Sequence, residues 1–157
     1  PPRVPPGGGT QPGGGMMALL LGCLLVHAVM VQLVPWPWWV PDVTLLGLIV
    51  AVGRSPGRWL VLSGIAGLWT VLWAVRFQAP LLAAYLAVGW TVQALGRRWD
   101  ASDPAVQGVL VGWAASLMTV GALWLHDLWS VPVAALAGVH VGITCAALPL
   151  VRRMASR

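Results

Sequence analysis

The sequence has 157 residues, of which 59% are hydrophobic and only 8% are charged, and its mean hydropathy is +0.83. About a quarter of the residues of a soluble domain are charged, so this composition excludes a water-soluble globular protein and predicts an integral membrane protein. The formal net charge of +5 would favour nucleic-acid binding in a soluble protein. Because no basic stripe with exposed aromatic residues is present, we expect contact with anionic lipid and no nucleic-acid partner.

The first fifteen residues differ in composition from the rest of the chain. Residues 1–15 are mostly proline and glycine and have no apolar periodicity. Such a segment buries too little surface to offset the entropy lost on ordering, so we expect it to be disordered. The predicted organisation is a Pro/Gly-rich leader, 1–15, without an assigned function, and one transmembrane domain, 16–157.

Six apolar runs follow the leader. Their approximate bounds are 17–34, 42–52, 59–75, 80–95, 104–125 and 131–151. Most approach the roughly 20 residues that a helix needs to cross a bilayer. The run at 42–52 is short, so we expect it to tilt or to use the preceding tryptophan-rich turn to reach across. Pro41-Asp42 and Asp103-Pro104 are typical of helix starts. The sequence thus predicts an all-α integral membrane protein, a single bundle of about six transmembrane helices.

All nine basic residues are arginines, and they alternate along the chain. The breaks after the second, fourth and sixth runs contain Arg54, Arg58, Arg97, Arg98, Arg152, Arg153 and Arg157. The breaks after the first, third and fifth runs contain only Arg76. Cytoplasmic loops carry an excess of basic residues, so this pattern predicts a multi-pass protein with both termini in the cytoplasm. Arg76 is then a candidate outer-face residue that snorkels to lipid headgroups or contacts a partner.

Small residues recur at every fourth position of the last two runs. The fifth run has Gly108, Gly112 and Ser116, and the sixth has Ala134, Gly138, Gly142 and Ala146. Helices in lipid lack a hydrophobic drive to associate, so small residues that allow close backbone approach supply much of the packing. We expect these two stripes to pack inside the bundle, with a docking face for a partner helix as the alternative.

Two histidines lie near the middle of apolar runs. His27 is in the first run and His140 in the sixth, so both are expected at a similar membrane depth. Ionisable side chains there are costly and are functional-site candidates. The sequence suggests no intramembrane carboxylate beside them. We therefore expect neutral histidines hydrogen-bonded to a backbone carbonyl, to Thr144 or to Gln32, rather than a proton relay.

Catalytic and metal-binding patterns are missing from the sequence. Cys23 and Cys145 match no metal-binding or redox spacing. No nucleophile with a matching base, phosphate-binding loop or HExxH motif occurs. The sequence predicts a protein that is not an enzyme and has no cofactor.

A series of landmarks follows the leader in a recognisable order. They are Gln32-Leu-Val-Pro-Trp-Pro37, Pro41-Asp42, Gly64, Gly67, Leu81-Leu-Ala-Ala-Tyr85-Leu-Ala-Val-Gly89, Arg97-Arg98, Gln107 and Arg152-Arg153. In these features, and in its length and orientation, the chain resembles the rod shape-determining protein MreD family of bacteria. One feature departs from the family, whose members often carry an acidic residue in the third helix. Here the corresponding segment, Leu68-Trp69-Thr70-Val71, has no acidic residue.

The resemblance implies a non-enzymatic component of the bacterial inner membrane that belongs to the cell-elongation machinery. MreD-like proteins associate with MreC and, through it, with the MreB filament, RodA-type synthases and penicillin-binding proteins that make peptidoglycan. The implied fold is similar to the six-helix substrate-binding subunits of energy-coupling-factor vitamin transporters. A subunit of that kind is the alternative function, and it would need a pocket with converging polar groups near the outer face.

Overall fold

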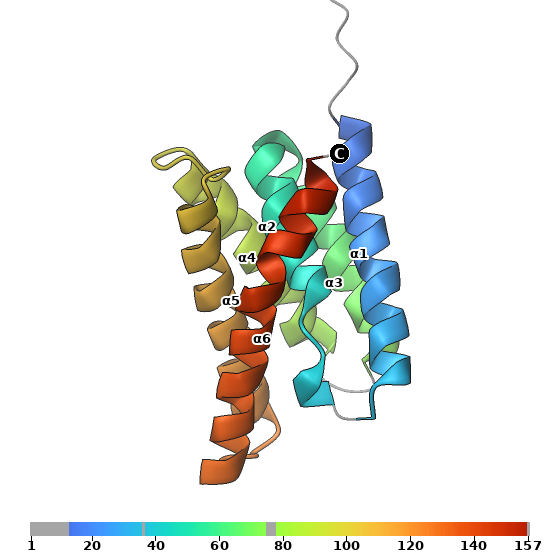
Figure 1. The fold of residues 1–157 in the computed structure, drawn as a ribbon, viewed down its shortest axis with the longest axis vertical. Helices are drawn as coiled ribbons and strands as arrows, with labels where there is room; N and C mark the ends of the chain where they lie inside the picture. The colour runs from blue at the N-terminus through green and yellow to red at the C-terminus, as the bar shows by residue number, and fades with distance from the viewer. Residues whose placement is uncertain (1–12, 36, 75–77, 157) are drawn as a thin grey trace, which may run out of the picture.

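The computed structural model describes residues 13–35, 37–74 and 78–156, which form six α-helices, two short 3-10 helices and no strand. The elements are α1 (Gly13–Leu33), η1 (Pro37–Trp39), α2 (Val43–Arg54), η2 (Pro56–Arg58), α3 (Trp59–Trp73), α4 (Gln78–Gly96), α5 (Pro104–Leu125) and α6 (Val131–Ala155). Consecutive helices run in opposite directions, so the start of α1 and the end of α6 lie at the same end of the bundle (Figure 1). The predicted all-α class is confirmed.

The leader is shorter than predicted at its C-terminal boundary. Helix α1 begins at Gly13, so residues 13–15 are helical and do not belong to a disordered segment. Once the apolar part of a helix is formed, each added residue gains a hydrogen bond at little further cost, so the helix extends into the glycines. Residues 1–12 lie outside the part of the chain that the structure describes.

Four helices, α1, α4, α5 and α6, are long and apolar enough to cross a membrane. In contrast, α2 has 12 residues and α3 has 15. At 1.5 Å per residue these helices are about 18 Å and about 22 Å long, whereas the hydrocarbon core is about 30 Å thick. The structure therefore supports four of the six predicted spans by length and composition, and the two others are too short to cross on their own.

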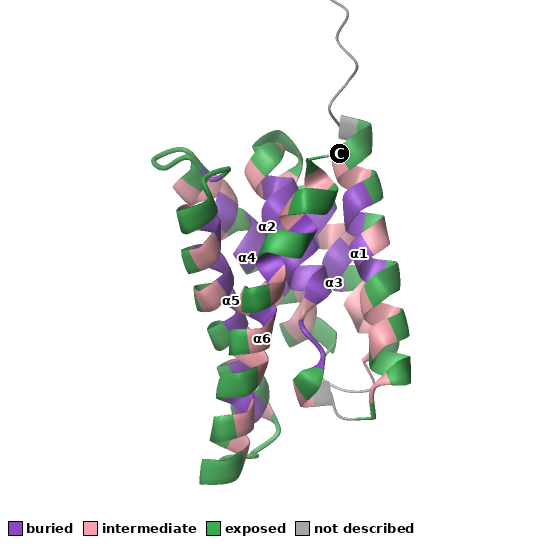
Figure 2. Cartoon of the chain, in the orientation of Figure 1, coloured by how far each residue is buried: buried purple, intermediate pink, exposed green. Residues whose placement is uncertain are grey.

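The short helix α2 lies at the centre of the bundle. It packs against all five other helices, and every residue from Val43 to Val52 is buried (Figure 2). A helix enclosed by protein has its apolar surface covered by neighbours and does not have to match the thickness of the lipid. This position explains why α2 is apolar on all sides.

Small residues make the closest helix contacts in this core, but not the ones predicted. A Cβ atom added at Gly89 of α4 would lie 1.7 Å from the Oγ of Ser63 on α3, and one added at Gly67 would lie 2.7 Å from Leu82. A Cβ at Gly47 of α2 would lie 2.7 Å from the Cβ of Cys23 on α1. Glycine thus allows the α3–α4 and α1–α2 backbones to approach closely.

The described arginines gather at one end of the bundle, here called the basic end. They are Arg54, Arg58, Arg97, Arg98, Arg152 and Arg153, which end or follow α2, η2, α4 and α6. The Arg54 side chain donates to the carbonyl of Ala155, and Nη2 of Arg152 donates to the carbonyl of Ser102 at 3.2 Å. These bonds join segments that are far apart in sequence, so the grouping is a property of the fold.

The loop between α4 and α5 at the basic end contains a fixed carboxylate. Ser102 donates to Oδ1 of Asp100 from its hydroxyl at 2.6 Å and from its backbone N–H at 2.9 Å. These two bonds hold the pKa of Asp100 below its ordinary value of 3.8. Because the pKa is lowered, any contribution of this contact to stability is present above pH 3.8 and is lost as the pH falls through the lowered pKa.

Asp103 caps α5 as its sequence predicts. Its Oδ1 accepts from the backbone N–H of Ala105 at 2.7 Å and of Val106 at 3.4 Å. We expect Asp103→Ala to lower the free energy of unfolding by about 1 kcal/mol, because two amide groups lose their partner. Asp103→Asn, which keeps an acceptor oxygen, should cost much less. Denaturant unfolding followed by circular dichroism in detergent measures both variants. If both lose the same unfolding free energy, the acceptor oxygen of residue 103 does not stabilise α5.

Candidate functional site

A cavity whose wall is mostly apolar but includes several polar side chains, here called the polar cavity, lies in the half of the bundle opposite the basic end. Its volume is about 280 Å³, and η1, the start of α2 and the five other α-helices all contribute to its wall. The polar and aromatic lining residues are His27, Trp38, Asp42, Thr70, Tyr85, Thr119 and His140. Leu81, Ala115, Met118 and Ala122 complete the wall. Seven elements that are distant in sequence therefore bring polar side chains to one place.

The carboxylate of this site comes from Asp42, at the N-terminus of α2. Its Oδ1 accepts from the backbone N–H of Leu45 at 2.9 Å, and its own backbone N–H donates to Oγ1 of Thr144 at 3.1 Å. The predicted role of Asp42 as a helix start is confirmed. Because α2 is short and central, its first turn lies inside the bundle, so the capping carboxylate also lines the cavity. The sequence pattern did not indicate that Asp42 would also line a cavity.

The two predicted histidines line the same cavity, one from α1 and one from α6. The expectation that no carboxylate accompanies them is wrong, because Asp42 lines the cavity with them. The expected hydrogen bonds are not made through Nδ1 of either ring. The Nδ1 atoms of His27 and His140 are buried and have no hydrogen-bond partner among the described residues. Leaving a buried polar atom unpaired costs about 1–3 kcal/mol, so such atoms need an explanation.

Tyr85 and Trp38 form the aromatic part of the wall. Tyr85 is only 2% exposed, and its hydroxyl faces the side chains of Asp42 and Thr70. The Thr70 hydroxyl donates to the carbonyl of Ala66 at 2.9 Å. Trp38 stands edge-on to His140, with ring centroids 6.4 Å apart. The sequence placed Trp38 only in the tryptophan-rich turn before the second apolar run and gave Tyr85 no role beyond a family landmark. Tyr85 is the only tyrosine in the chain, and its isolation in an apolar helix was the available signal.

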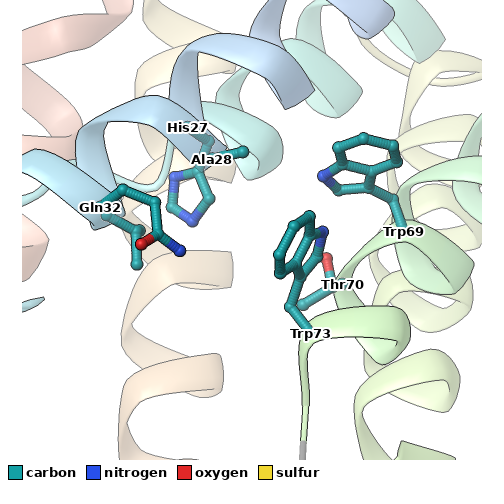
Figure 3. Close-up of a pocket in the computed structure, with 7 residues that line it drawn as sticks. His27, Ala28, Gln32, Trp69, Thr70 and Trp73 are labelled. Atoms are coloured by element: carbon teal, nitrogen blue, oxygen red, sulfur yellow. The ribbon is translucent and has the colours of Figure 1, made fainter.

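A second cavity of about 220 Å³ lies between α1 and α3 and shares His27 and Thr70 with the first. Figure 3 shows His27 and Gln32 from α1 on one side of this space, and Trp69 and Trp73 from α3 on the other. Trp73 is 62% exposed. The second cavity therefore lies beside the first, and the exposed Trp73 is part of its wall.

The α6 stripe of small residues faces outward. Ala134, Gly138, Gly142 and Ala146 are all exposed, whereas the buried residues of α6 include Ala137, Thr144, Leu148 and Val151. The expectation that this stripe packs inside the bundle is wrong. Helix α6 packs against α2 and α5 through its other face, which carries Ala137, Thr144, Leu148 and Val151.

The α5 stripe is divided between the interior and the surface. Gly108 and Gly112 are half-buried, and Ser116 is exposed. A Cβ added at Gly112 would lie 3.8 Å from Sγ of Cys145 on α6, whereas one at Gly108 would meet no atom within 4 Å. Between the two stripes runs a groove of about 250 Å³, lined by Ser116, Ala134 and Gly138 among others. The α5–α6 surface therefore presents small residues beside a groove.

Two further predictions concern Arg76 and metal binding. Arg76, the candidate outer-face arginine, lies outside the described residues. Within the described residues, no group of three or more His, Cys, Asp or Glu side chains could hold a metal ion. The arrangement is that of a binding site built from one carboxylate, two imidazoles, hydroxyls and aromatic rings.

Compared with known proteins, the chain matches no family model, no curated protein and no solved structure.

Proposed function

We propose that this protein is a non-enzymatic component of the cell-elongation machinery in the bacterial inner membrane, of the MreD type. Its partners would be an MreC-like protein and, in the same assembly, MreB, a RodA-type synthase and a penicillin-binding protein. Its function would be to hold membrane partners together through helix surfaces. The observation that carries the proposal is the exposed small-residue stripe of α6 beside the α5–α6 groove.

This surface suits a transmembrane helix of a partner. At Gly138 and Gly142 an added Cβ would meet no atom within 4 Å, so the backbone of α6 is open to close approach from outside. Small residues at four-residue spacing permit such an approach between helices in lipid. A scaffold that binds a single-helix partner would need a surface of this kind.

The distribution of charge supports the proposed orientation. With the basic end in the cytoplasm, both ends of the described chain would lie there too, in agreement with the positive-inside rule. We propose that all six helices follow this alternating path. The short helices α2 and α3 would complete their crossings with the adjoining non-helical segments, which is tolerated where protein or a polar cavity surrounds the backbone.

Affinity purification of the full chain from native membranes in mild detergent tests the proposal. Mass spectrometry should identify an MreC-like protein in the purified material, with or without the synthases. Recovery of two ATPases and a transmembrane coupling protein instead would refute it.

The polar cavity favours a second candidate function. A substrate-binding subunit of an energy-coupling-factor vitamin transporter would need converging polar groups near the outer face, and the cavity has such groups. On this alternative the α6 stripe would dock the coupling protein. The same purification separates the two functions, because their partners differ.

A further inference from the structure

We propose that the polar cavity binds an ammonium group, either of a small organic amine or of a zwitterionic phospholipid headgroup. This proposal does not rest on the scaffold function, which rests on the exposed small-residue stripe of α6. The ammonium would lie between the carboxylate of Asp42, the imidazoles of His27 and His140 and the ring of Trp38.

The charge of the wall favours a cation. Among the described residues that line the two cavities, Asp42 is the single carboxylate and none is an arginine. A carboxylate at membrane depth is costly unless a cation or hydrogen bonds compensate it. Its Oδ1 accepts from the backbone N–H of Leu45, and the Tyr85 hydroxyl lies close to the same carboxylate. An anionic ligand would be repelled at this position.

The remaining lining groups suit the positive charge of such a ligand. The imidazole rings of His27 and His140 line the cavity, and the Nδ1 atom of each ring is buried without a hydrogen-bond partner among the described residues. Trp38 and Tyr85 line the cavity with aromatic rings, and aromatic rings attract ammonium groups through their quadrupole. Carboxylate, imidazole and aromatic groups thus converge on one space of about 280 Å³.

The size and position of the site limit the ligand. Drug-sized ligands occupy pockets of roughly 300–1,000 Å³, so the cavity suits a small amine or the headgroup of a larger lipid. The second cavity, with Trp69 and Trp73 at the α1–α3 surface (Figure 3), offers a lateral path that a lipid headgroup could use. A soluble amine would enter from the end of the bundle opposite the basic end. Both sources present the same ammonium chemistry to Asp42.

The test uses the purified full chain with ethanolamine and choline as soluble probes and phosphatidylethanolamine as the lipid probe, with phosphatidylglycerol as the anionic comparison. Tryptophan fluorescence and thermal unfolding measure binding of the soluble probes, and native mass spectrometry measures retained lipid. We expect saturable binding of at least one ammonium probe and preference for phosphatidylethanolamine over phosphatidylglycerol if the source is lipid. Binding of a soluble probe without lipid retention would identify a soluble amine as the source.

Asp42→Asn is the decisive variant, because asparagine still caps a helix but has no charge. We expect at least a tenfold loss of ammonium binding. Asp103→Asn makes the same change at the cap of α5, away from the cavity, and should leave binding within twofold of the original. Trp38→Leu changes neither charge nor cap and should weaken binding at least threefold, which provides a second test if the Asp42 variant does not fold. Unchanged binding in Asp42→Asn, a preference for phosphatidylglycerol or no binding of any ammonium probe would each overturn the proposal.

Discussion

A double variant, Gly138→Leu with Gly142→Leu, is expected to abolish partner binding while leaving the fold intact. Both glycines are exposed on α6, and a Cβ at either position would meet no atom of the protein within 4 Å. The bundle can therefore accommodate the added side chains. A partner helix that packs on the stripe would be held away by both leucines, and close packing between helices would be lost. Recovery of the MreC-like partner in affinity purification should fall at least tenfold, equivalent to about 1.4 kcal/mol or more.

A matched control separates this effect from a general effect of leucine in the membrane. Gly22 on α1 also has no atom within 4 Å of an added Cβ, but it lies on a different helix from the proposed docking surface. Gly22→Leu should retain the partner. Equal retention by the double variant and by Gly22→Leu would show that the α6 stripe is not the docking surface.

Gly89→Ala is expected to have the largest effect on stability. The added Cβ would lie 1.7 Å from Oγ and 3.0 Å from Cβ of Ser63, closer than van der Waals contact allows. Rotation of the Ser63 hydroxyl would relieve the first contact but not the second, so helices α3 and α4 would also have to shift. Overpacking of this kind costs about 1–3 kcal/mol. The polar cavity would be altered too, because Thr70 and Tyr85 project from these two helices. Thermal and denaturant unfolding of the detergent-purified protein measure the loss.

Replacing Ser63 is expected to restore part of the stability that Gly89→Ala removes. The hydroxyl of Ser63 is buried and has no hydrogen-bond partner among the described residues, so Ser63→Ala alone should cost little. In the Gly89→Ala background it removes the closest atom and should restore part of the lost stability. Gly64→Ala is the control on α3, because an added Cβ there meets no atom within 4 Å. A Gly89→Ala protein as stable as the Gly64→Ala protein would contradict this account of the α3–α4 contact.

The candidate site was only partly predictable. His27 and His140 were identified because an ionisable residue in an apolar run is unusual in any membrane helix. Asp42 was recognised only as a helix cap, since its position at the predicted membrane edge gave no reason to place it beside histidines in the middle of their runs. Its position in the cavity depends on α2 being short, central and enclosed by the other helices. That arrangement is a result of packing, which local sequence does not specify.

The sequence by itself determined the all-α class, the approximate helix ends and the segregation of arginines into alternate breaks. These features depend on hydropathy, on proline and capping residues and on charge, which act over a few neighbouring residues. Only the tertiary structure decided which face of each helix is buried. In lipid both faces of an apolar helix are equally tolerated, so spacing alone could not show that Gly89 lies against Ser63 while Gly138 faces outward. The convergence of Asp42, Tyr85 and the two histidines on one cavity was decided in the same way, by how six similar helices pack together.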